Sequence, residues 1–190
     1  MNRKDFEIMA PVGSYESLWA AINAGADAVY FGVEGLNMRA RSSVNFTLDD
    51  LHEIASICES HGVKSYLTVN TIIYDEDLEK MHQVIDAVAV SGISAIIASD
   101  MAAILYARQR GVEVHISTQQ SVGNTPTVRY LSQFADVVVL ARELNLDQVS
   151  RIHRAIEEEN ICGPRGEKVR IEMFCHGALC MAVSGKCYLS

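Results

Sequence analysis

Residues 48–70 read L-D-D-L-H-E-I-A-S-I-C-E-S-H-G-V-K-S-Y-L-T-V-N, and this stretch contains one complete repeat of the fold. Its first part, from Leu48 to Ser60, predicts a helix, and Gly62 stands where helices often end with a left-handed residue. Its last part, from Lys64 to Asn70, is a largely apolar run that predicts a buried strand. A helix followed at once by a strand is therefore the unit from which the chain is built.

The same unit recurs along the chain. The phrases A-G-A-D (24–27), H-G-V-K (61–64) and R-G-V-E (110–113) each place a glycine at a helix end directly before a strand. Strands are predicted at 6–9, 28–33, 64–70, 95–98, 112–117, 137–140 and 169–174. Helices are predicted at 14–23, 48–60, 78–90, 102–110, 127–134 and 146–158.

The apolar runs of the strands are continuous rather than alternating, which is typical of a parallel sheet covered on both faces by helices. Seven strand-helix repeats without long gaps favour a TIM-type (β/α)8 barrel over a doubly wound open sheet. The loop after the first strand, A-P-V-G-S, also lacks the G-x-G-x-x-G pattern of dinucleotide-binding sheets. We expect one barrel domain over residues 1–190 with about seven β/α units. An eighth strand is not visible, unless Lys186 to Ser190 is its beginning.

Composition limits the classes of function. The chain has 190 residues, 49% of them hydrophobic, and a net charge of -8, which argues against a strongly basic surface for nucleic acid or anionic membrane. The N-terminus has no apolar leader, and no run approaches the ~18 apolar residues that cross a bilayer. The odd number of cysteines, five, is typical of reduced thiols, so we expect a cytoplasmic protein without membrane contact.

Polar residues follow several predicted strands, and in a barrel all such residues share one mouth. Arg39, Arg41 and Arg142 stand among them, and guanidinium groups bind the paired oxygens of a dicarboxylate or a phosphate. The other residues of the predicted mouth are Asn70, Asp100, Ser117, Gln119, Glu143, Glu172 and His176.

Five of these residues also have a purely structural interpretation. Arg142 and Glu143 can cap the next helix and pair with surface neighbours, and Arg39 and Arg41 can lie on a solvated loop. Asp100 precedes a helix that starts at Met101, which is the position of an N-cap. The sequence leaves both interpretations open.

His115 lies inside a predicted strand and Cys58 inside a predicted helix, so we interpret both as buried core residues. The other thiols, Cys162, Cys175, Cys180 and Cys187, do not have the paired spacing of a zinc ribbon, although iron-sulfur clusters accept irregular spacing. From spacing alone, metal ligation, nucleophilic catalysis and inert thiols all remain open. Cys175 and its neighbour His176 form a poor catalytic pair, because adjacent residues of a strand point to opposite faces.

The stretch 172–190, E-M-F-C-H-G-A-L-C-M-A-V-S-G-K-C-Y-L-S, resembles the signature of the peptidase family U-32, also called collagenase-like proteases. The segments A-P-V-G-S, G-A-D-A-V-Y-F-G, L-T-V-N-T, H-I-S-T-Q and L-A-R-E-L are similar to the family as well. The resemblance therefore extends over essentially the whole chain. It implies a barrel, and it implies that these 190 residues are the N-terminal portion of a longer protein, because the family pattern continues further.

The resemblance implies an activity and a cofactor. The pattern is closest to family members that are oxygen-independent, prephenate-dependent hydroxylases of transfer RNA uridine, some with a four-iron four-sulfur cluster. The family's cluster ligands match Cys180 and Cys187, plus two cysteines in a later segment, so we expect an intact cluster only in the full-length protein. Cys162 and Cys175 lie outside that pattern.

On this basis we expect Glu172, His176 and Asp100 to be catalytic, and the remaining mouth residues to bind substrate. The expected partners are a small dicarboxylate such as prephenate, transfer RNA through the part of the protein beyond Ser190, and a second copy of the chain. Two alternatives remain, namely a collagenase-like peptidase that hydrolyses peptide bonds and a non-catalytic binding module.

Overall fold

The computed structural model describes residues 3–33, 46–177 and 182–185. In this part of the chain, seven parallel strands form one sheet in chain order. The strands are β1 (Met9–Pro11), β2 (Ala28–Phe31), β3 (Lys64–Val69), β4 (Ala95–Ala98), β5 (Val114–Ile116), β6 (Val137–Val139) and β7 (Arg170–Glu172). The α-helices are α1 (Tyr15–Asn23), α2 (Leu51–Ser60), α3 (Leu78–Ser91), α4 (Met101–Gln109), α5 (Thr125–Leu131) and α6 (Leu146–Glu159).

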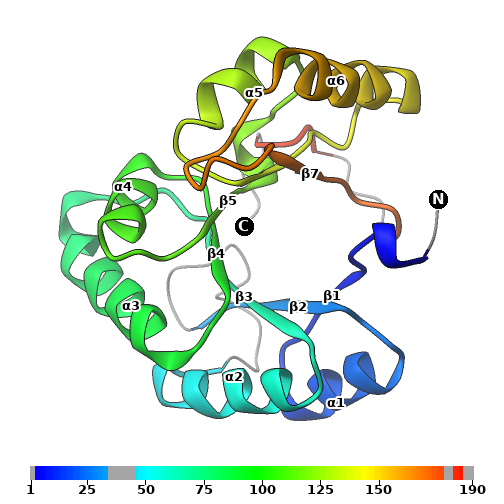
Figure 1. Cartoon of the computed structure of the whole chain (residues 1–190). Coiled ribbons are helices and arrows are strands. Elements are labelled where there is room, and N and C mark those ends of the chain that lie inside the picture. The colour runs from blue at the N-terminus through cyan, green and yellow to red at the C-terminus, as the bar shows by residue number, and fades with distance from the viewer. Residues whose placement is uncertain (1–2, 34–45, 178–181, 186–190) are drawn as a thin grey trace.

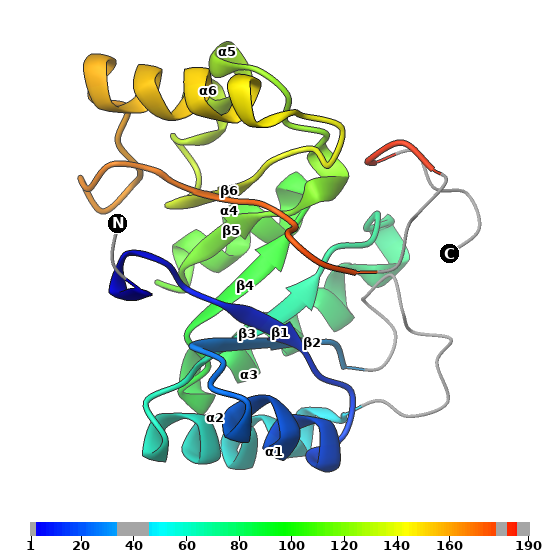
Figure 2. The same ribbon diagram turned by 90° about the vertical axis from the view of Figure 1, so that its right-hand side faces the viewer.

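The sheet curls into an arc with the helices on its outer side, and the arc is open between β7 and β1 (Figure 1). Seen from the side, the strands run in one direction, so their carboxyl ends share one end of the barrel (Figure 2). The expected TIM-type α/β architecture is confirmed. The residues proposed for an eighth strand, 186–190, lie outside the described part of the chain, and the expectation of a single domain stays a prediction.

Local sequence explains where the helices begin and end. The Ser14 side chain accepts a hydrogen bond from the Ser17 amide at 3.3 Å and caps α1, and Asn145 caps α6 in the same manner through the Gln148 amide at 2.9 Å. Gly92 ends α3 with a φ of 86°, a left-handed conformation that costs a glycine little. These caps are short-range features, which is why the predicted helices agree with the observed ones to within a few residues.

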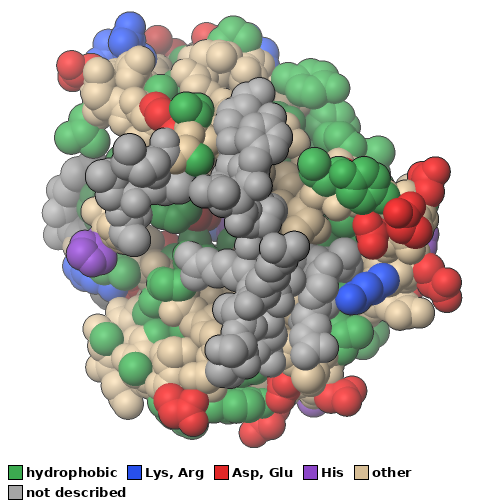
Figure 3. All heavy atoms as spheres, turned by 180° about the vertical axis from the view of Figure 1, so that it is seen from behind, with side chains coloured by type: hydrophobic (Ala, Val, Ile, Leu, Met, Phe, Trp, Pro, Cys, Tyr) green, Lys and Arg blue, Asp and Glu red, His purple; other side chains and the backbone are tan. Residues whose placement is uncertain are grey.

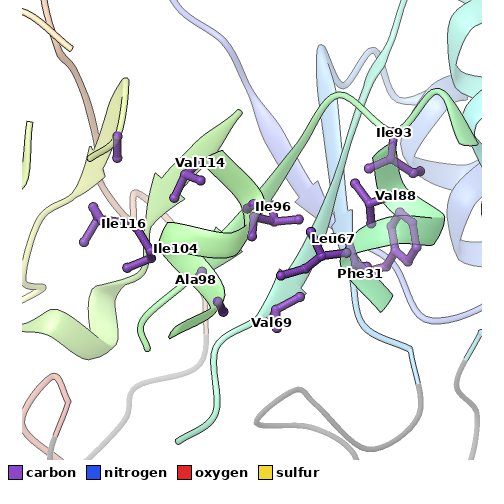
Figure 4. Packing of buried hydrophobic residues seen from close by; sticks show 14 of the residues in the cluster. Phe31, Leu67, Val69, Val88, Ile93, Ile96, Ala98, Ile104, Val114 and Ile116 are labelled. Carbon is purple, nitrogen blue, oxygen red and sulfur yellow. The ribbon is translucent and has the colours of Figure 1, made fainter. Parts of the chain in front are cut away.

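The main core lies between the outer face of the sheet and the helices. Leu67 of β3 and Ile96 of β4 are fully buried there, and they pack in one layer with Phe31, Val114 and helix residues such as Ile104 (Figure 4). The inner face carries a second, smaller cluster around Tyr66 and Ala95. Alternate residues of each strand therefore go to different environments.

The first strand differs from its prediction. The apolar run 6–9 was expected to form it, but pairing with β2 begins at Met9 opposite Ala28, and Phe6 and Ile8 are about half exposed. The run stands at the open edge of the sheet, where only one neighbouring strand is available to pair with it. Among the helices that the structure describes, none combines the length and apolar character needed to cross a membrane.

Candidate functional site at the carboxyl ends of the strands

Figure 3 looks onto the end of the barrel where the strands finish. Acidic side chains gather at the periphery of the described surface on this face, and basic side chains are sparse (Figure 3). Arg39 and Arg41, which were expected to contribute here, lie outside the described residues, as do Cys180 and Cys187. The expected site residues that the structure describes therefore follow β3 to β7.

Asp100 follows β4 and caps α4. One of its carboxylate oxygens accepts a hydrogen bond from the Ala102 amide at 2.9 Å, and the other accepts one from the Ile73 amide at 3.2 Å. Nearby, the Asn70 carbonyl accepts a hydrogen bond from the Ser99 hydroxyl at 3.0 Å. Asp100 thus links the exits of β3 and β4 as well as capping a helix, and its expected catalytic role stays a prediction.

Ser117 and Gln119 lie where β5 ends. Ser117 is buried, and its hydroxyl accepts a hydrogen bond from the Gln119 amide at 3.3 Å, which starts the short helix η4 (Thr118–Gln120). The side chain of Gln120 donates to the Ser99 carbonyl, so this turn is tied to the neighbouring exit of β4. The β5 exit is therefore a fixed turn in the wall of the mouth.

Ser184 anchors residues 182–185 to the exits of β5 and β6. Its amide donates to the Glu143 carboxylate at 2.8 Å, its hydroxyl accepts from the Arg142 amide at 3.3 Å, and its carbonyl accepts from the Ser121 hydroxyl. We call this set of contacts the Ser184 anchor. It buries Ser184 to 1% exposure, and the hydrogen bond from the Ser184 amide lowers the pKa of Glu143.

The Arg142 side chain takes part in the same arrangement. Its guanidinium donates to the Ala182 carbonyl at 3.3 Å and lies 6.0 Å from the centre of the Phe174 ring. Arg142 remains exposed on the face of the mouth. Arg142 and Glu143, both expected to bind substrate, therefore hold residues 182–185 in place.

Gly185 makes the closest approach in this region. A Cβ at this position would lie 2.3 Å from the Gln119 carbonyl oxygen, and the residue has a φ of +69°. Both observations exclude a side chain, because the backbone of η4 cannot give way by so much and left-handed conformations favour glycine. The sequence requirement for glycine here is set by docking onto η4.

Below the mouth, a polar group occupies the inner face of the sheet. His115 of β5 is buried, its Nε2 lies 3.3 Å from Glu113 Oε1, and its Nδ1 lies 3.9 Å from Glu172 Oε2. The ring of Tyr66 lies 4.5 Å from the His115 ring between centroids. Nδ1 of His115 has no hydrogen-bond partner among the described residues, although it is buried.

Two carboxyl groups around His115 have opposite pKa shifts. Burial raises the pKa of Glu172 to about 7, and the nearby charge of Glu7 adds to the increase. Burial also acts to raise the pKa of Glu113, but the hydrogen bond from His115 and the charges of Arg165 and Arg170 outweigh it and lower the pKa to about 2. At neutral pH Glu113 is therefore ionised, while Glu172 is close to half protonated.

The remaining expected site residues are dispersed. Cys175 and His176 follow β7 and are exposed. Cys58 is buried in α2, where burial raises the pKa of its thiol to about 11, and Cys162 precedes β7 with its thiol donating to the Asn160 carbonyl at 3.4 Å. No group of three or more His, Cys, Asp or Glu side chains within the described ranges is arranged to hold a metal ion. The described thiols therefore do not form a four-thiolate set, and the expected ligands lie beyond these ranges.

Sequence reasoning missed the polar group inside the barrel. It interpreted His115 as a core residue, which is right as to burial, but it did not connect His115 with Glu113 and Glu172. The available signal was the alternation in E-V-H and R-I-E (113–115 and 170–172), which places two polar side chains on one face of a strand. Ser184 was also missed, because a small polar residue in a loop carries no comparable pattern.

Comparison with known proteins identifies the family. Residues 13–190 match the family model described as Peptidase family U32, so the chain belongs to this family. It is also similar to a solved structure of a U32 peptidase, with a TM-score of 0.66 at 13% identity, over 88% of this chain and 66% of the other. That similarity supports the fold alone.

Two curated relatives have different names. The chain is 70% identical over 190 residues to a protein of Porphyromonas gingivalis named "Collagenase", which covers all of this chain and 46% of the relative. It is 33% identical over 189 residues to the "tRNA hydroxylation protein P" of Escherichia coli, which covers 97% of this chain and 39% of the relative. The chain thus spans less than half the length of these two relatives.

The docking of Gly185 predicts the effect of adding a methyl group. We expect Gly185→Ala to release residues 182–185 and to speed hydrogen exchange of the Ser184 amide by about tenfold or more, because the lost contacts protect that amide. The measurement is hydrogen exchange followed by mass spectrometry or NMR.

Gly166→Ala is the matched control for this variant. Gly166 also has a positive φ, +81°, but nothing lies within 4 Å of its added Cβ. Equal exchange of the Ser184 amide in Gly185→Ala and wild type would contradict the contact.

The raised pKa of Glu172 predicts a pH-dependent stability. An acid with a raised folded-state pKa contributes most below its unfolded pKa, near 4.5, and this contribution is lost as the pH rises through about 7. We therefore expect the free energy of unfolding of Glu172→Gln at pH 8.5 to exceed that of wild type by about 2–3 kcal/mol, and the two to be equal near pH 5. Urea unfolding at the two pH values is the measurement. The exposed Glu167→Gln is the control, and a constant difference across pH would refute the shift.

Proposed function

We propose that the whole protein is an oxygen-independent RNA hydroxylase that modifies transfer RNA uridine with prephenate as oxygen donor. The observation that carries this proposal is the Ser184 anchor, which holds residues 182–185 against the exits of β5 and β6. The resemblance of residues 172–190 and the relative named for tRNA hydroxylation support it. The cysteines expected to bind the cluster thus flank, in sequence, a segment that is fixed at the mouth.

In this proposal the mouth binds a small dicarboxylate. Arg142 is exposed beside Phe174 and can offer guanidinium hydrogen atoms to a carboxylate, and Arg39 and Arg41 are proposed to complete the set. Ser117, Gln119 and Asn70 line the fixed exits of β5 and β3 beneath it. Glu172 and His176 are the proposed groups for proton transfer.

The proposed cofactor is a four-iron four-sulfur cluster, which would supply one-electron redox chemistry. Cys180 and Cys187 would provide two thiolates, and the other two would come from a part of the protein beyond these 190 residues. Transfer RNA would bind outside this acidic portion, since a net charge of -8 does not favour a polyanion. We place the protein in the cytoplasm, where its RNA substrate is found, and a second copy of the chain is a further proposed partner.

Analysis of transfer RNA nucleosides tests the hydroxylase. In a host lacking its own copy of the gene, we expect the full-length protein to restore hydroxylated uridine, and Cys187→Ala to reduce the product at least about tenfold by removing a ligand. Cys162→Ala is the matched control and should retain the product. Mass spectrometry is the measurement. If the wild-type protein did not restore hydroxylated uridine, the proposal would be rejected.

A second candidate is a peptidase, and the 70% identity to the protein named "Collagenase" favours it. The described residues offer one exposed thiol and one exposed imidazole together, at Cys175 and His176, but neighbours in the chain form a poor nucleophile and base. His115, the buried histidine with carboxylates beside it, has no hydroxyl or thiol hydrogen-bonded to its Nδ1 among the described residues. We therefore rank hydrolysis second.

Gelatin cleavage by the full-length protein tests the peptidase. If this candidate holds, wild type cleaves gelatin, and Cys175→Ala and His176→Ala each lower the rate about a hundredfold or more, as expected for loss of a nucleophile or its base. The exposed His153→Ala serves as the control. Cleavage that persists in both site variants, or that is missing in wild type, would exclude this pair as a peptidase site.

A further inference from the structure

The inner face of the barrel contains a histidine whose two ring nitrogens differ in their surroundings. Nε2 of His115 lies within hydrogen-bond distance of Glu113, at 3.3 Å, while Nδ1 is buried without a partner among the described residues. A buried polar atom without a partner is costly, typically about 1–3 kcal/mol, unless a ligand or water satisfies it. Nδ1 therefore marks a place where a further group belongs.

Glu113 fixes the tautomer of His115. The pKa of Glu113 is lowered to about 2, so its carboxylate is ionised at neutral pH and accepts the proton on Nε2. Two cations also pair with this carboxylate, namely Arg170 with Oε1 at 2.5 Å and Arg165 with Oε2. In the tautomer that carries its proton on Nε2, Nδ1 has a free lone pair and is an acceptor, oriented as a base is oriented by a carboxylate partner.

Glu172 lies across a gap from Nδ1. The distance from Nδ1 to Glu172 Oε2 is 3.9 Å, which is too long for a direct hydrogen bond. If an oxygen atom lay about 2.8 Å from both Nδ1 and Oε2, the Nδ1–O–Oε2 angle would be about 90°. A bridging hydroxyl or water oxygen can adopt this angle. The Glu172 side chain is 23% exposed and that of His115 only 3%, so solvent reaches the gap on the side of Glu172.

We propose that His115 Nδ1 and the Glu172 carboxyl group bind one hydroxyl oxygen, of water or of an alcohol or phenol, and that Nδ1 accepts its proton. The hydroxyl donates to Nδ1 and accepts from the Glu172 carboxyl in the protonated half of the population. An anionic oxygen does not fit, because it has no proton to give to Nδ1 and would face the carboxylates of Glu113 and Glu7. The ligand class is therefore a neutral hydroxyl group.

The proton transfer is balanced without a further reactant. The O–H bond of the ligand breaks, an N–H bond forms at Nδ1, and the imidazole becomes an imidazolium stabilised by the Glu113 carboxylate. As this proton leaves, the carboxyl proton of Glu172 passes to the same oxygen, so the ligand remains a neutral hydroxyl and Glu172 becomes a carboxylate. No electron is transferred, so the step is compatible with either reaction considered above.

Charged and polar groups from several neighbouring elements surround His115 and Glu172. Tyr66 of β3 contacts the His115 ring and donates its hydroxyl to Glu7 Oε1 at 2.6 Å, and Lys64 donates to Glu7 Oε2 at 2.6 Å. Arg170 of β7 and Arg165 pair with Glu113. Among the described residues, Glu113 and Glu7 thus each pair with a cation, whereas no ion pair with a cation is found for Glu172.

Nitrogen NMR of the protein labelled at histidine tests the tautomer. We expect His115 at pH 7 to carry its proton on Nε2, with Nδ1 unprotonated. In Glu113→Gln the ionised acceptor is gone, so the Nδ1 and Nε2 signals should shift toward a mixture of tautomers. Glu167→Gln, an exposed change of the same chemistry, should leave them unchanged. A wild-type His115 protonated on Nδ1 would overturn the proposal.

A crystal structure at pH 7, with and without a methanol soak, tests the hydroxyl site directly. We expect one oxygen within hydrogen-bond distance of both Nδ1 and Glu172 Oε2, and expect the methanol oxygen to replace it on soaking. In His115→Gln and Glu172→Gln, which preserve size and polarity, occupancy of this position should fall. A direct hydrogen bond between His115 and Glu172, or a gap with no ordered oxygen, would overturn the proposal.

The rate of RNA hydroxylation, if the full-length protein has this activity, adds a functional readout. Loss of a proton acceptor is expected to lower the rate about 10²–10⁴-fold in His115→Gln, against little change in His153→Gln on the outer surface. Equal rates in the two variants would remove the proton-accepting role. Because the NMR and crystallographic tests need no RNA, failure of the hydroxylase proposal and failure of this site are distinguishable.

Discussion

The arrangement of this protein depends on burying one face of a parallel sheet beneath its helices. Leu67 and Ile96 belong to that face and are removed from water entirely. Burial of apolar area is the main favourable term in folding, so it fixes which residues of each strand point outward. Because side chains alternate along a strand, the positions that point into the barrel are then fixed as well.

Inward-facing positions carry the unusual chemistry. Glu113, His115, Arg170 and Glu172 lie on the inner side of strands whose other faces are apolar. Burying such groups is costly unless they are paired, and Arg165 and Arg170 offset the charge of Glu113. What remains is an acceptor nitrogen and a carboxyl group without a mutual hydrogen bond, at the base of the mouth.

The signature segment and the inner polar group meet at the same end of the barrel by different means. Residues 182–185 are attached from above through Ser184 and the close approach of Gly185 to η4. His115 and Glu172 are part of strands β5 and β7 and are positioned by the sheet itself. The Ser184 anchor and the pair of His115 and Glu172 thus lie at one end of the barrel, with Arg142 beside both the anchor and Phe174.

The sequence by itself determined the strand-helix order, most element boundaries and the parallel barrel architecture, because these follow from local apolar runs, caps and glycines. It also placed the polar residues that follow the strands at one mouth. Only the tertiary structure decided that Arg142 and Glu143 hold Ser184, and that Glu113, His115 and Glu172 meet. Except for the neighbours Glu113 and His115, those contacts join residues 41 to 57 positions apart on different strands and loops, and such distances depend on curvature, register and packing that no local pattern encodes.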